Sequence, residues 1–368
     1  MSTSYDVVIV GAGPAGSLTA RYAAQGGLRT LLLDKKNLIG EPVRCGEFIP
    51  AVNELKNFFP RAQELKEIFT FPKNLIAQDI SSVRVFSPYG KVYEFPIQGY
   101  TVERKWFDKY LVEEAKKAGA IIKTGEKVIR LEKNKVITEK GTYETKVIVG
   151  ADGPSSLVAH FAGLPKNKEY ALSAQYEMSD LKIEPLVMEM YTGKIAPGAY
   201  AWIIPKGEQR ANVGVGIRKR FSGEESVVKL LKYFISHSPA SKKVTQGKPL
   251  SFITGLVPTG GPPPQTVKDN LLLVGDAAGQ VLPITGGGIP TAMICGRIAG
   301  QVCVEHLRSS VSLYEYEKRW REELGTGFFR IWYLGKKLEW ICHFDWGLEF
   351  FIRILGDKGI EKAIKLQF

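Results

Sequence analysis

DVVIVGAGPAG, residues 6–16, joins a continuous β-branched run to the glycine pattern G-x-G-x-x-G. A helix-like segment, Ser17–Gln25, follows the glycines and stops at a Gly-Gly pair. A second apolar run, Thr30–Leu33, then ends at Asp34. This order of strand, glycine turn, helix and strand, with an acidic residue at its end, predicts a βαβ unit that binds a dinucleotide.

Each residue of the pattern has a physical task in such a unit. Gly11 allows the tight turn, Gly13 lets the backbone approach a pyrophosphate, and Gly16 lets helix and strand pack closely. The helix N-terminus offers N–H groups to the phosphates, and Asp34 is placed to accept hydrogen bonds from ribose hydroxyls. A glycine turn in some other α/β protein is the alternative.

The length and composition limit the number of domains and the kinds of binding partner to expect. The chain has 368 residues, of which 44% are hydrophobic and 24% charged. This length predicts two or three domains, and the composition excludes a disordered chain, a collagen and a disulfide scaffold. Lysine and arginine number 50 against 38 aspartates and glutamates, a formal charge of +12 that is spread along the chain. Such a surface favours an acidic partner or anionic lipid rather than nucleic acid.

Cysteine and histidine spacing argues against a metal site. The four cysteines form no C-x-x-C pair, and the four histidines occur in no H-x-x-x-H or H-E-x-x-H pattern. The N-terminus has no basic segment followed by an apolar run and a cleavage site. We therefore expect no metal and a cytoplasmic location, with the cytoplasmic membrane surface as a further option.

Periodicity and turn residues predict the remaining elements. Ser81–Phe95 reads as a hairpin and Arg104–Ala118 as a helix. Tyr170–Ile217 alternates polar and apolar residues between Gly and Pro turns, which predicts a mostly antiparallel sheet in a second domain. Residues 311–368 are helical in pattern, with aromatic side chains among basic ones, and form either an amphipathic membrane contact or a helical layer on the core.

Two further strands end in Gly and Asp. Val147–Ser156 reads VIVGADGPSS, and Leu271–Gly279 reads LLLVGDAAG. Because ligands of an open α/β sheet bind at the carboxyl ends of its strands, these two ends and the first glycine turn predict one composite cofactor site. For Asp152 and Gly153 a plain turn is a close alternative.

The ordered set of glycine motif, D-G element and G-D element resembles that of the FAD-dependent oxidoreductases with the para-hydroxybenzoate hydroxylase fold. Over nearly the whole chain the sequence is most similar to the geranylgeranyl reductase family, including its archaeal digeranylgeranylglycerophospholipid reductases. The matching segments are Glu41–Gly46, the R-x-x-F-D run at Arg104–Asp108, and Tyr200–Gly207 (YAWIIPKG) followed by Asn212–Gly216 (NVGVG). Two positions depart from the family pattern: Ile204 stands where Phe is usual, and Asp34 replaces the commoner Glu.

The resemblance implies an α/β fold in which a Rossmann-type FAD-binding domain is interleaved with a mostly antiparallel β-sheet substrate domain, plus C-terminal helices. The expected divisions are residues 1–80, 99–165 and 268–310 for the FAD-binding domain, 81–98 and 166–267 for the substrate-binding sheet, and 311–368 for the C-terminal helical region.

FAD is the implied cofactor, held along its length by several segments. The implied contacts are Gly11, Gly13, Ala15, Gly16 and Arg104 at the pyrophosphate, Asp34 at the ribose, Val128 at the adenine, Asp276 at the ribityl or phosphate portion, and Gly288 and Ile289 at the isoalloxazine. A helix that starts at Ile289 would point its N-terminus at the N1/O2 edge of the flavin, where its dipole stabilises the anionic reduced form.

Cys45, Gly46 and Phe48 are implied to lie near the flavin ring, with Cys45 as the candidate catalytic residue. A small buried hydrophobe is the alternative for Cys45, and a nucleophilic thiolate there would need a cationic neighbour such as Arg44. We prefer a flavin-contact role to a covalent one.

The implied activity is reduction of C=C bonds in an isoprenoid (geranylgeranyl) chain of a membrane lipid or lipid precursor, by hydride transfer from reduced flavin N5. Tyr200 and Trp202, which share one face of a strand, would wall the pocket for this chain, with ordinary core packing as their alternative. An isolated double bond also needs a proton at its other carbon, and Cys45, Tyr200 and water are all candidates.

Two other functions stay open on the sequence. A flavin monooxygenase acting on an aromatic or quinone-like substrate shares the first motifs, although the Y-x-W pattern disfavours it. An electron-relay flavoprotein between ferredoxin and quinone suits the basic charge. Ferredoxin, NAD(P)H and other donors are all compatible with the sequence as the reductant.

Overall fold

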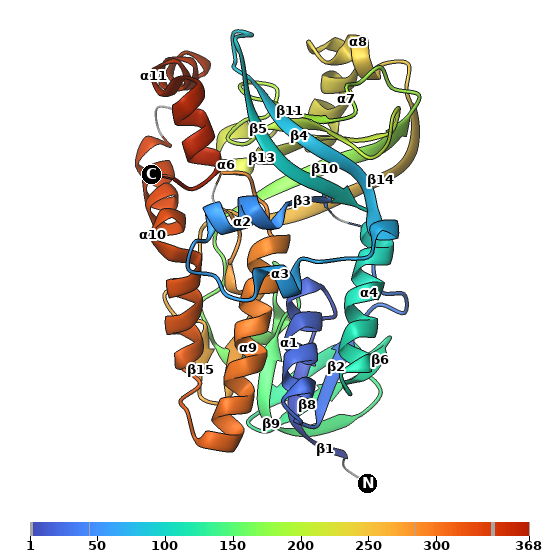
Figure 1. Cartoon of the computed structure of the whole chain (residues 1–368), viewed down its shortest axis with the longest axis vertical. Coiled ribbons are helices and arrows are strands. Elements are labelled where there is room, and N and C mark those ends of the chain that lie inside the picture. Colours follow the sequence, from blue (N-terminus) through green and yellow to red (C-terminus); the bar gives the residue numbers. More distant parts are fainter. Residues whose placement is uncertain (1–2, 44, 283, 340–342, 368) are drawn as a thin grey trace.

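The computed structural model describes residues 3–43, 45–282, 284–339 and 343–367. Two sheets lie one above the other along the long axis, with the N-terminal strand at the lower end of the view (Figure 1). The chain passes from one sheet to the other several times, so each sheet is assembled from segments that are distant in sequence.

The first sheet is built around the predicted βαβ unit. Its strands are β1 Thr3–Val10, β2 Thr30–Asp34, β6 Ile121–Thr124, β7 Val128–Glu132, β8 Lys135–Thr138, β9 Thr142–Gly150, β15 Val267–Lys268 and β16 Leu271–Leu273. Strand β1 pairs in parallel with β2 on one side and with β9 on the other, in the order β15-β16-β9-β1-β2-β6. The β7–β8 hairpin joins through β9.

Both faces of β1 are buried. The helices of this half are α1 Pro14–Gln25, α4 Arg104–Lys117, α5 Leu157–Ala162 and α9 Ile289–Ser309. Val7 and Ile9 belong to the core that includes α1 and α9, whereas Val8 and Val10 belong to the core that includes β7, β8 and α5. A strand covered on both faces explains why residues 6–10 form a nearly continuous apolar run.

The second sheet is antiparallel except where β11 runs parallel to β4. Its strands are β3 Phe48–Pro50, β4 Ile76–Phe86, β5 Val92–Val102, β10 Tyr170–Ser179, β11 Val187–Tyr191, β12 Ala201–Pro205, β13 Ala211–Arg218 and β14 Lys248–Pro258. The order is β14-β10-β13-β12-β11-β4-β5-β3. The predicted hairpin is the β4–β5 pair, and it is longer than expected, so the boundaries proposed at residues 80 and 98 fall inside these strands.

Helices α6 Lys219–Ser222, α7 Val227–His237 and α8 Ser241–Val244 cover one face of the second sheet. Helices α2 Val52–Phe58 and α3 Leu65–Ile68 and the 3-10 helix η1 Lys73–Leu75 lie in the connection from β3 to β4, where α2 contacts β5 and α3 contacts α9. The 3-10 helix η2 Gly275–Ala278 follows β16 and contacts α9. Leu231 and Phe234 of α7 pack in one core with Val213 and Val215 of β13. The opposite face of the sheet is left to border a cavity.

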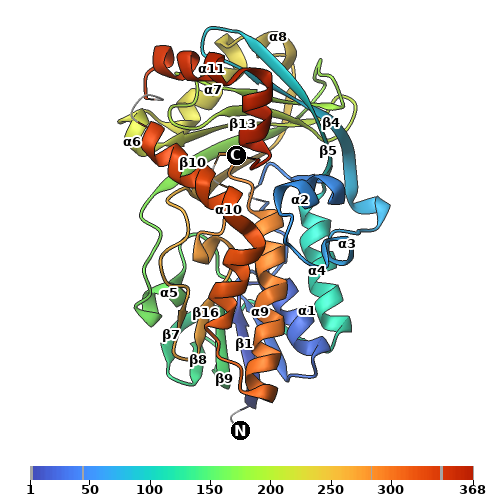
Figure 2. The ribbon, with the colours of Figure 1, turned by 60° about the vertical axis from the view of Figure 1, so that its left-hand side comes forward.

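The C-terminal region is helical, as its sequence predicts. Helix α10 (Glu315–Leu338) packs beside α9 and rises to the level of the second sheet, and α11 (Asp345–Ile364) lies at that upper end (Figure 2). Gly325, with φ 75°, interrupts α10. Trp320 and Phe328 of α10 are fully buried, so this helix forms a layer on the core.

Candidate functional site

A cavity of about 370 Å³ lies between the two sheets, next to the residues that follow β1, β9 and β16. Several predicted site residues line it: Gly13, Ala15, Cys45, Gly46, Phe48, Arg104, Tyr200, Trp202, Asp276, Gly288 and Ile289. The remaining ones, Gly11, Gly16, Asp34 and Val128, lie outside its wall. The structure thus brings residues from both ends of the chain to one place.

The three motif glycines differ in what surrounds them. A Cβ on Gly11, whose φ is +106°, would lie 2.2 Å from the carbonyl oxygen of Ala151, and one on Gly16 would lie 1.9 Å from the oxygen of Gly11. A Cβ on Gly13 would meet no atom within 4 Å. Gly11 and Gly16 are therefore required by packing, whereas Gly13 leaves open space at the N-terminus of α1.

Asp34 supports the glycine turn from β2. Its carboxylate accepts hydrogen bonds from the backbone N–H groups of Ala12 and Lys36, each at 2.8 Å. Val128 is buried in β7, where it pairs with Thr138. The contact of Asp34 with a ribose remains a prediction, and so does the contact of Val128 with an adenine.

Asp276 and the start of α9 form the opposite wall. The Asp276 carboxylate receives no hydrogen bond within the described chain, and burial raises its pKa from 3.8 to about 6, although Arg104 acts in the other direction. Its Oδ1 is 3.0 Å from the place of a Cβ on Gly288, the N-cap of α9. Two helix N-termini, open space at Gly13 and an unpaired carboxyl on one cavity fit FAD, which carries phosphates and hydroxyls.

Two predicted polar residues are engaged within the protein. Arg104 lines the cavity, but its guanidinium binds both oxygens of Asp108 at 3.0 Å each. Asp152 accepts hydrogen bonds from the backbone N–H groups of Leu157 and Val158 at the start of α5, and Gly153 lines the cavity. For Asp152 the local-turn interpretation therefore describes the observed contacts.

The Cys45 thiol is held by its own loop. Its Sγ accepts a hydrogen bond from the backbone N–H of Glu47 at 3.1 Å. Burial raises the pKa of this thiol, while Arg104 opposes the change. The thiol therefore keeps its proton at neutral pH, which disfavours a thiolate nucleophile. Arg44, which the sequence suggested as a cationic neighbour, lies outside the described residues, and the cation that acts on the thiol within them is Arg104.

Tyr200 and Trp202 share the cavity wall, as alternation predicts. Their rings meet edge to face with centroids 5.7 Å apart. The Tyr200 hydroxyl donates to the carbonyl of Thr285, and burial raises its pKa. The Trp202 indole donates to Gln175 at 3.1 Å, and the Gln175 amide donates to the Cys45 carbonyl at 2.9 Å. Trp202 is thereby linked to the Cys45 loop.

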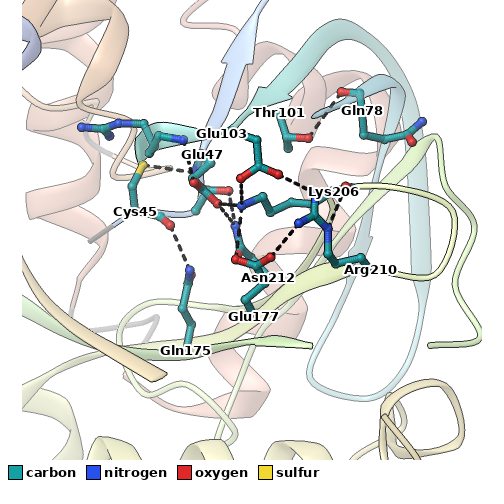
Figure 3. Close-up of polar contacts among 12 residues, drawn as sticks. Cys45, Glu47, Gln78, Thr101, Glu103, Gln175, Glu177, Lys206, Arg210 and Asn212 are labelled. Carbon is teal, nitrogen blue, oxygen red and sulfur yellow. Dashed lines mark hydrogen bonds and ion pairs between the residues drawn. The ribbon is translucent and has the colours of Figure 1, made fainter. Parts of the chain in front are cut away.

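A buried ionic cluster lies behind this loop, and sequence reasoning missed it (Figure 3). The Lys206 ammonium, on a side chain only 2% exposed, is 2.7 Å from a carboxylate oxygen of Glu47, whose side chain is 1% exposed. It also lies 3.1 Å from Glu103 and 3.3 Å from Glu177. The cluster's only local signal in the sequence is the lysine directly after the apolar strand AWIIP, which needs a counter-ion if the fold buries it.

A second cavity, of about 710 Å³, adjoins the first. Gly198, Ala199, Tyr200 and Ile284 line both. The C-terminal region supplies five apolar residues to the wall of the second cavity, Ile331, Leu348, Phe351, Ile352 and Leu355, together with the charged residues Lys336, Glu339 and Asp345. The two cavities thus share a wall at Tyr200, and the second is the larger and has a mainly apolar lining.

Known proteins match both halves of this arrangement. Residues 169–257 match the geranylgeranyl reductase catalytic domain, and residues 5–182 match the pyridine nucleotide-disulphide oxidoreductase family. The digeranylgeranylglycerophospholipid reductase of Methanocaldococcus jannaschii is 42% identical, over 87% of this chain and 83% of that protein. The chain belongs to the geranylgeranyl reductase family.

Solved structures agree with this membership. A geranylgeranyl bacteriochlorophyll reductase-like protein of Thermoplasma acidophilum superposes with a TM-score of 0.85 at 30% identity, covering 100% of this chain and 97% of that one. A flavin-dependent brominase, at 20% identity and a TM-score of 0.74 over 99% and 94% of the two chains, shares the fold alone. These matches confirm the fold class, the FAD cofactor and the oxidoreductase class predicted from the sequence.

The matched catalytic-domain segment of the family runs from just before β10 to the end of β14. It therefore contains Tyr200 and Trp202 of the cavity wall together with Lys206 and Asn212 of the ionic cluster. Among the residues that the structure describes, no group of three or more His, Cys, Asp or Glu side chains could hold a metal ion.

Proposed function

We propose that the protein is an FAD-dependent reductase that saturates C=C bonds in the isoprenoid chain of a membrane lipid or lipid precursor. One observation carries this proposal: the cavity bounded by Gly13 and Asp276 shares lining residues, Tyr200 among them, with a larger and mainly apolar cavity. A dinucleotide and a long apolar chain would meet end to end in such a space. The name of the relative from Methanocaldococcus jannaschii, a digeranylgeranylglycerophospholipid reductase, supports the same substrate class.

The chain's own residues would position the substrate and keep water away. Bound reduced FAD supplies the hydride. Tyr200 lines both cavities and Trp202 lines the first. Apolar residues of α10 and α11 line the larger cavity, so an isoprenoid chain bound there would remove its apolar surface from water. Exclusion of water also protects any cationic character that develops at the reacting bond.

The proton donor we propose is Cys45. Its thiol lines the cavity, and burial raises its pKa, so the proton is present at neutral pH. The competing phenol of Tyr200 donates its proton to the Thr285 carbonyl, and burial raises its pKa as well. The thiol is the group whose hydrogen is not committed to a backbone acceptor in the described contacts.

A reaction with a geranylgeranyl lipid tests the proposal directly. The purified holoprotein is reduced anaerobically, the lipid is added, and the product is weighed by mass spectrometry. A gain of two hydrogens for each reduced bond is the expected result. Product with one added oxygen, formed only in air from an aromatic substrate, would instead identify a monooxygenase. Flavin reoxidation by quinone without any prenyl turnover would identify an electron relay.

We further propose that α11 rests on an anionic membrane surface. Trp346, Phe350 and Ile354 repeat at every fourth residue along α11 and are 61%, 62% and 65% exposed. Arg353 and Lys358 lie on the same helix, and such a mixture of apolar and basic side chains suits the interface of an anionic bilayer. None of the helices in the described part of the chain is long and apolar enough to cross a membrane.

Vesicle sedimentation tests this contact. The double variant Trp346→Ser, Phe350→Ser should lose most of the binding of the unmodified protein to phosphatidylglycerol vesicles. Tyr233→Ser, which removes an aromatic ring that is 52% exposed on α7, is the matched control and should bind normally. Equal binding by the double variant and the control would contradict a membrane contact through α11.

A further inference from the structure

The ionic cluster beside Cys45 needs a physical reason. Removing an ammonium and a carboxylate from water is unfavourable, and well-packed apolar residues often stabilise a fold as much as a buried ion pair does. Glu47, which lines the cavity, and Lys206, which does not, are nevertheless almost completely buried. A functional site next to the pair is the place to look for that reason.

We infer that Glu47 and Lys206, together with Asn212, are positioning residues that hold the Cys45 thiol at the cavity wall and balance the charge around it. This inference deepens the proposed function and rests on it only for the assignment of Cys45 to the reaction. None of the three residues needs to touch the substrate or the cofactor to act in this way.

The first argument is the backbone conformation of Glu47. Its φ is +73°, in the left-handed region that residues with a side chain rarely adopt. Its carboxylate is fixed by three donors: the backbone N–H of Arg104 at 3.0 Å, the Asn212 amide and the Lys206 ammonium. These contacts hold the conformation in which the Glu47 N–H points at the Cys45 sulfur.

The second argument is that the substrate-side sheet holds the rest of the loop. The Asn212 amide donates to the carbonyl of Gly46 at 3.2 Å, and the Gln175 amide donates to the carbonyl of Cys45. Strands β13 and β10 supply these two residues. Figure 3 shows Gln175 below Cys45, and Lys206 reaching into the group of carboxylates. The thiol is thus fixed from the sheet that also presents Trp202.

The third argument is electrostatic. The charged and titratable groups that act on the Cys45 thiol are Glu47, whose charge raises the thiol pKa, and Arg104 of α4, whose charge lowers it; the Tyr200 phenol also interacts with the thiol. Lys206 neutralises Glu47, and the half-exposed Arg210 pairs with Glu103 and Glu177 at the outer end. The cluster thereby limits how strongly Glu47 opposes ionisation of the thiol.

Alkylation of Cys45 in the holoenzyme tests the inference without any prenyl substrate. Iodoacetamide is added over a range of pH, and each modified cysteine is located by peptide mass spectrometry. Glu47→Gln should lower, by about one unit, the pH at which the alkylation rate of Cys45 reaches half its maximum. At a pH below that midpoint, Cys45 of the variant should therefore react about tenfold faster than Cys45 of the unmodified protein. Lys206→Met should raise the midpoint, because the Glu47 carboxylate then lacks its counter-ion and opposes ionisation of the thiol more strongly.

A third variant tests the positioning of the thiol without changing any charge. It also keeps the inference testable if Lys206→Met does not fold. Asn212→Ser removes the amide contacts and leaves every charge in place, so Cys45 should react several-fold faster at all pH values with an unchanged midpoint. The matched control is Lys243→Met. Lys243 is the ammonium partner of Glu189, a buried carboxylate on β11 of the same sheet that has no contact with the Cys45 loop. That control should leave Cys45 reactivity unchanged.

The outcomes distinguish the inference from the proposed function. The positioning inference is overturned if Glu47→Gln and Asn212→Ser behave like the Lys243→Met control. It is also overturned if the buried Cys295 and Cys303 become reactive together with Cys45, since that would indicate a general loosening of the fold. If the variants behave as expected while the unmodified protein reduces no prenyl lipid, the positioning of Cys45 stands and the proposed function fails.

Discussion

Replacing Gly13 by Ala should weaken FAD binding while leaving the fold intact. The backbone at Gly13 has φ −78° and ψ −175°, which alanine adopts without strain, and a Cβ there would meet no protein atom within 4 Å. The only structural cost is a poorer N-cap for α1, about 1 kcal/mol or less. The new methyl group would instead occupy the space into which we expect the pyrophosphate to fit.

The size of the effect follows from the contact that would be lost. Pushing a phosphate oxygen away from the N-terminus of α1 removes about one charge-assisted hydrogen bond, worth roughly 1.5–3 kcal/mol. The dissociation constant of FAD should therefore rise by about tenfold to a hundredfold. Titration of the apoprotein, followed by quenching of FAD fluorescence, measures that constant, and thermal unfolding of the apoprotein measures the fold.

Two other glycines provide the comparison. Gly141→Ala also places its methyl group in open space, in the turn before β9 and away from the cavity, so both measurements should match the unmodified protein. Gly16→Ala would bring a Cβ to 1.9 Å from the Gly11 oxygen and should lower the unfolding temperature itself. If Gly13→Ala binds FAD as tightly as Gly141→Ala, the pyrophosphate does not lie at this turn and our assignment of the cofactor cavity is refuted.

Three further predictions concern the cavity walls and the core. Burial raises the pKa of Asp276 from 3.8 to about 6 on folding, so the folded apoprotein binds the extra proton and loses stability as pH rises through that window. Asp276→Asn should therefore stabilise the apoprotein above pH 6 by up to about 3 kcal/mol in urea unfolding, and should not stabilise it below about pH 4. Gly214→Ala, whose Cβ would lie 2.3 Å from the Trp202 ring, should displace the indole and lower kcat with FAD content unchanged, which absorbance and product analysis check. Arg297→Met should leave Glu323 without its buried partner and lower the free energy of unfolding by about 3–5 kcal/mol in urea titration.

The fold was predictable where local sequence and long-range packing agree. The βαβ start combines a fully buried strand with a steric need for glycine at Gly11 and Gly16, and both signals lie within a few residues of one another. The limits of β4 and β5 were not predictable in the same way. Their extra residues, 76–80 and 96–102, pair mainly with each other, and β3 supplies a second partner for residues 99–101 from a distant part of the chain.

Part of the site could be predicted from local sequence motifs, and part depends on contacts between residues far apart in the sequence. Cys45, Tyr200 and Trp202 stand in motifs that can be read along the chain, and the structure brings them to one cavity. Glu47 is different, because its partners Lys206 and Asn212 are more than 150 positions away in sequence and nothing near Glu47 indicates them. Charge pairing across such a distance depends on how β12 and β13 meet the Cys45 loop, which only the assembled sheet defines.

Helix α11 has apolar side chains on two faces, so the two sequence interpretations of the C-terminal region do not exclude each other. Leu348, Ile352 and Leu355 line the larger cavity, while Trp346, Phe350 and Ile354 face outward from the same helix. A surface helix of a globular protein normally has one apolar stripe, and one that is apolar all round is normally buried. Because α11 is apolar towards the cavity and also towards the outside, packing within the chain accounts for only half of its sequence. The membrane contact proposed for α11 would account for the other half, and it would place the source of a lipid chain one helix away from the cavity proposed to receive it.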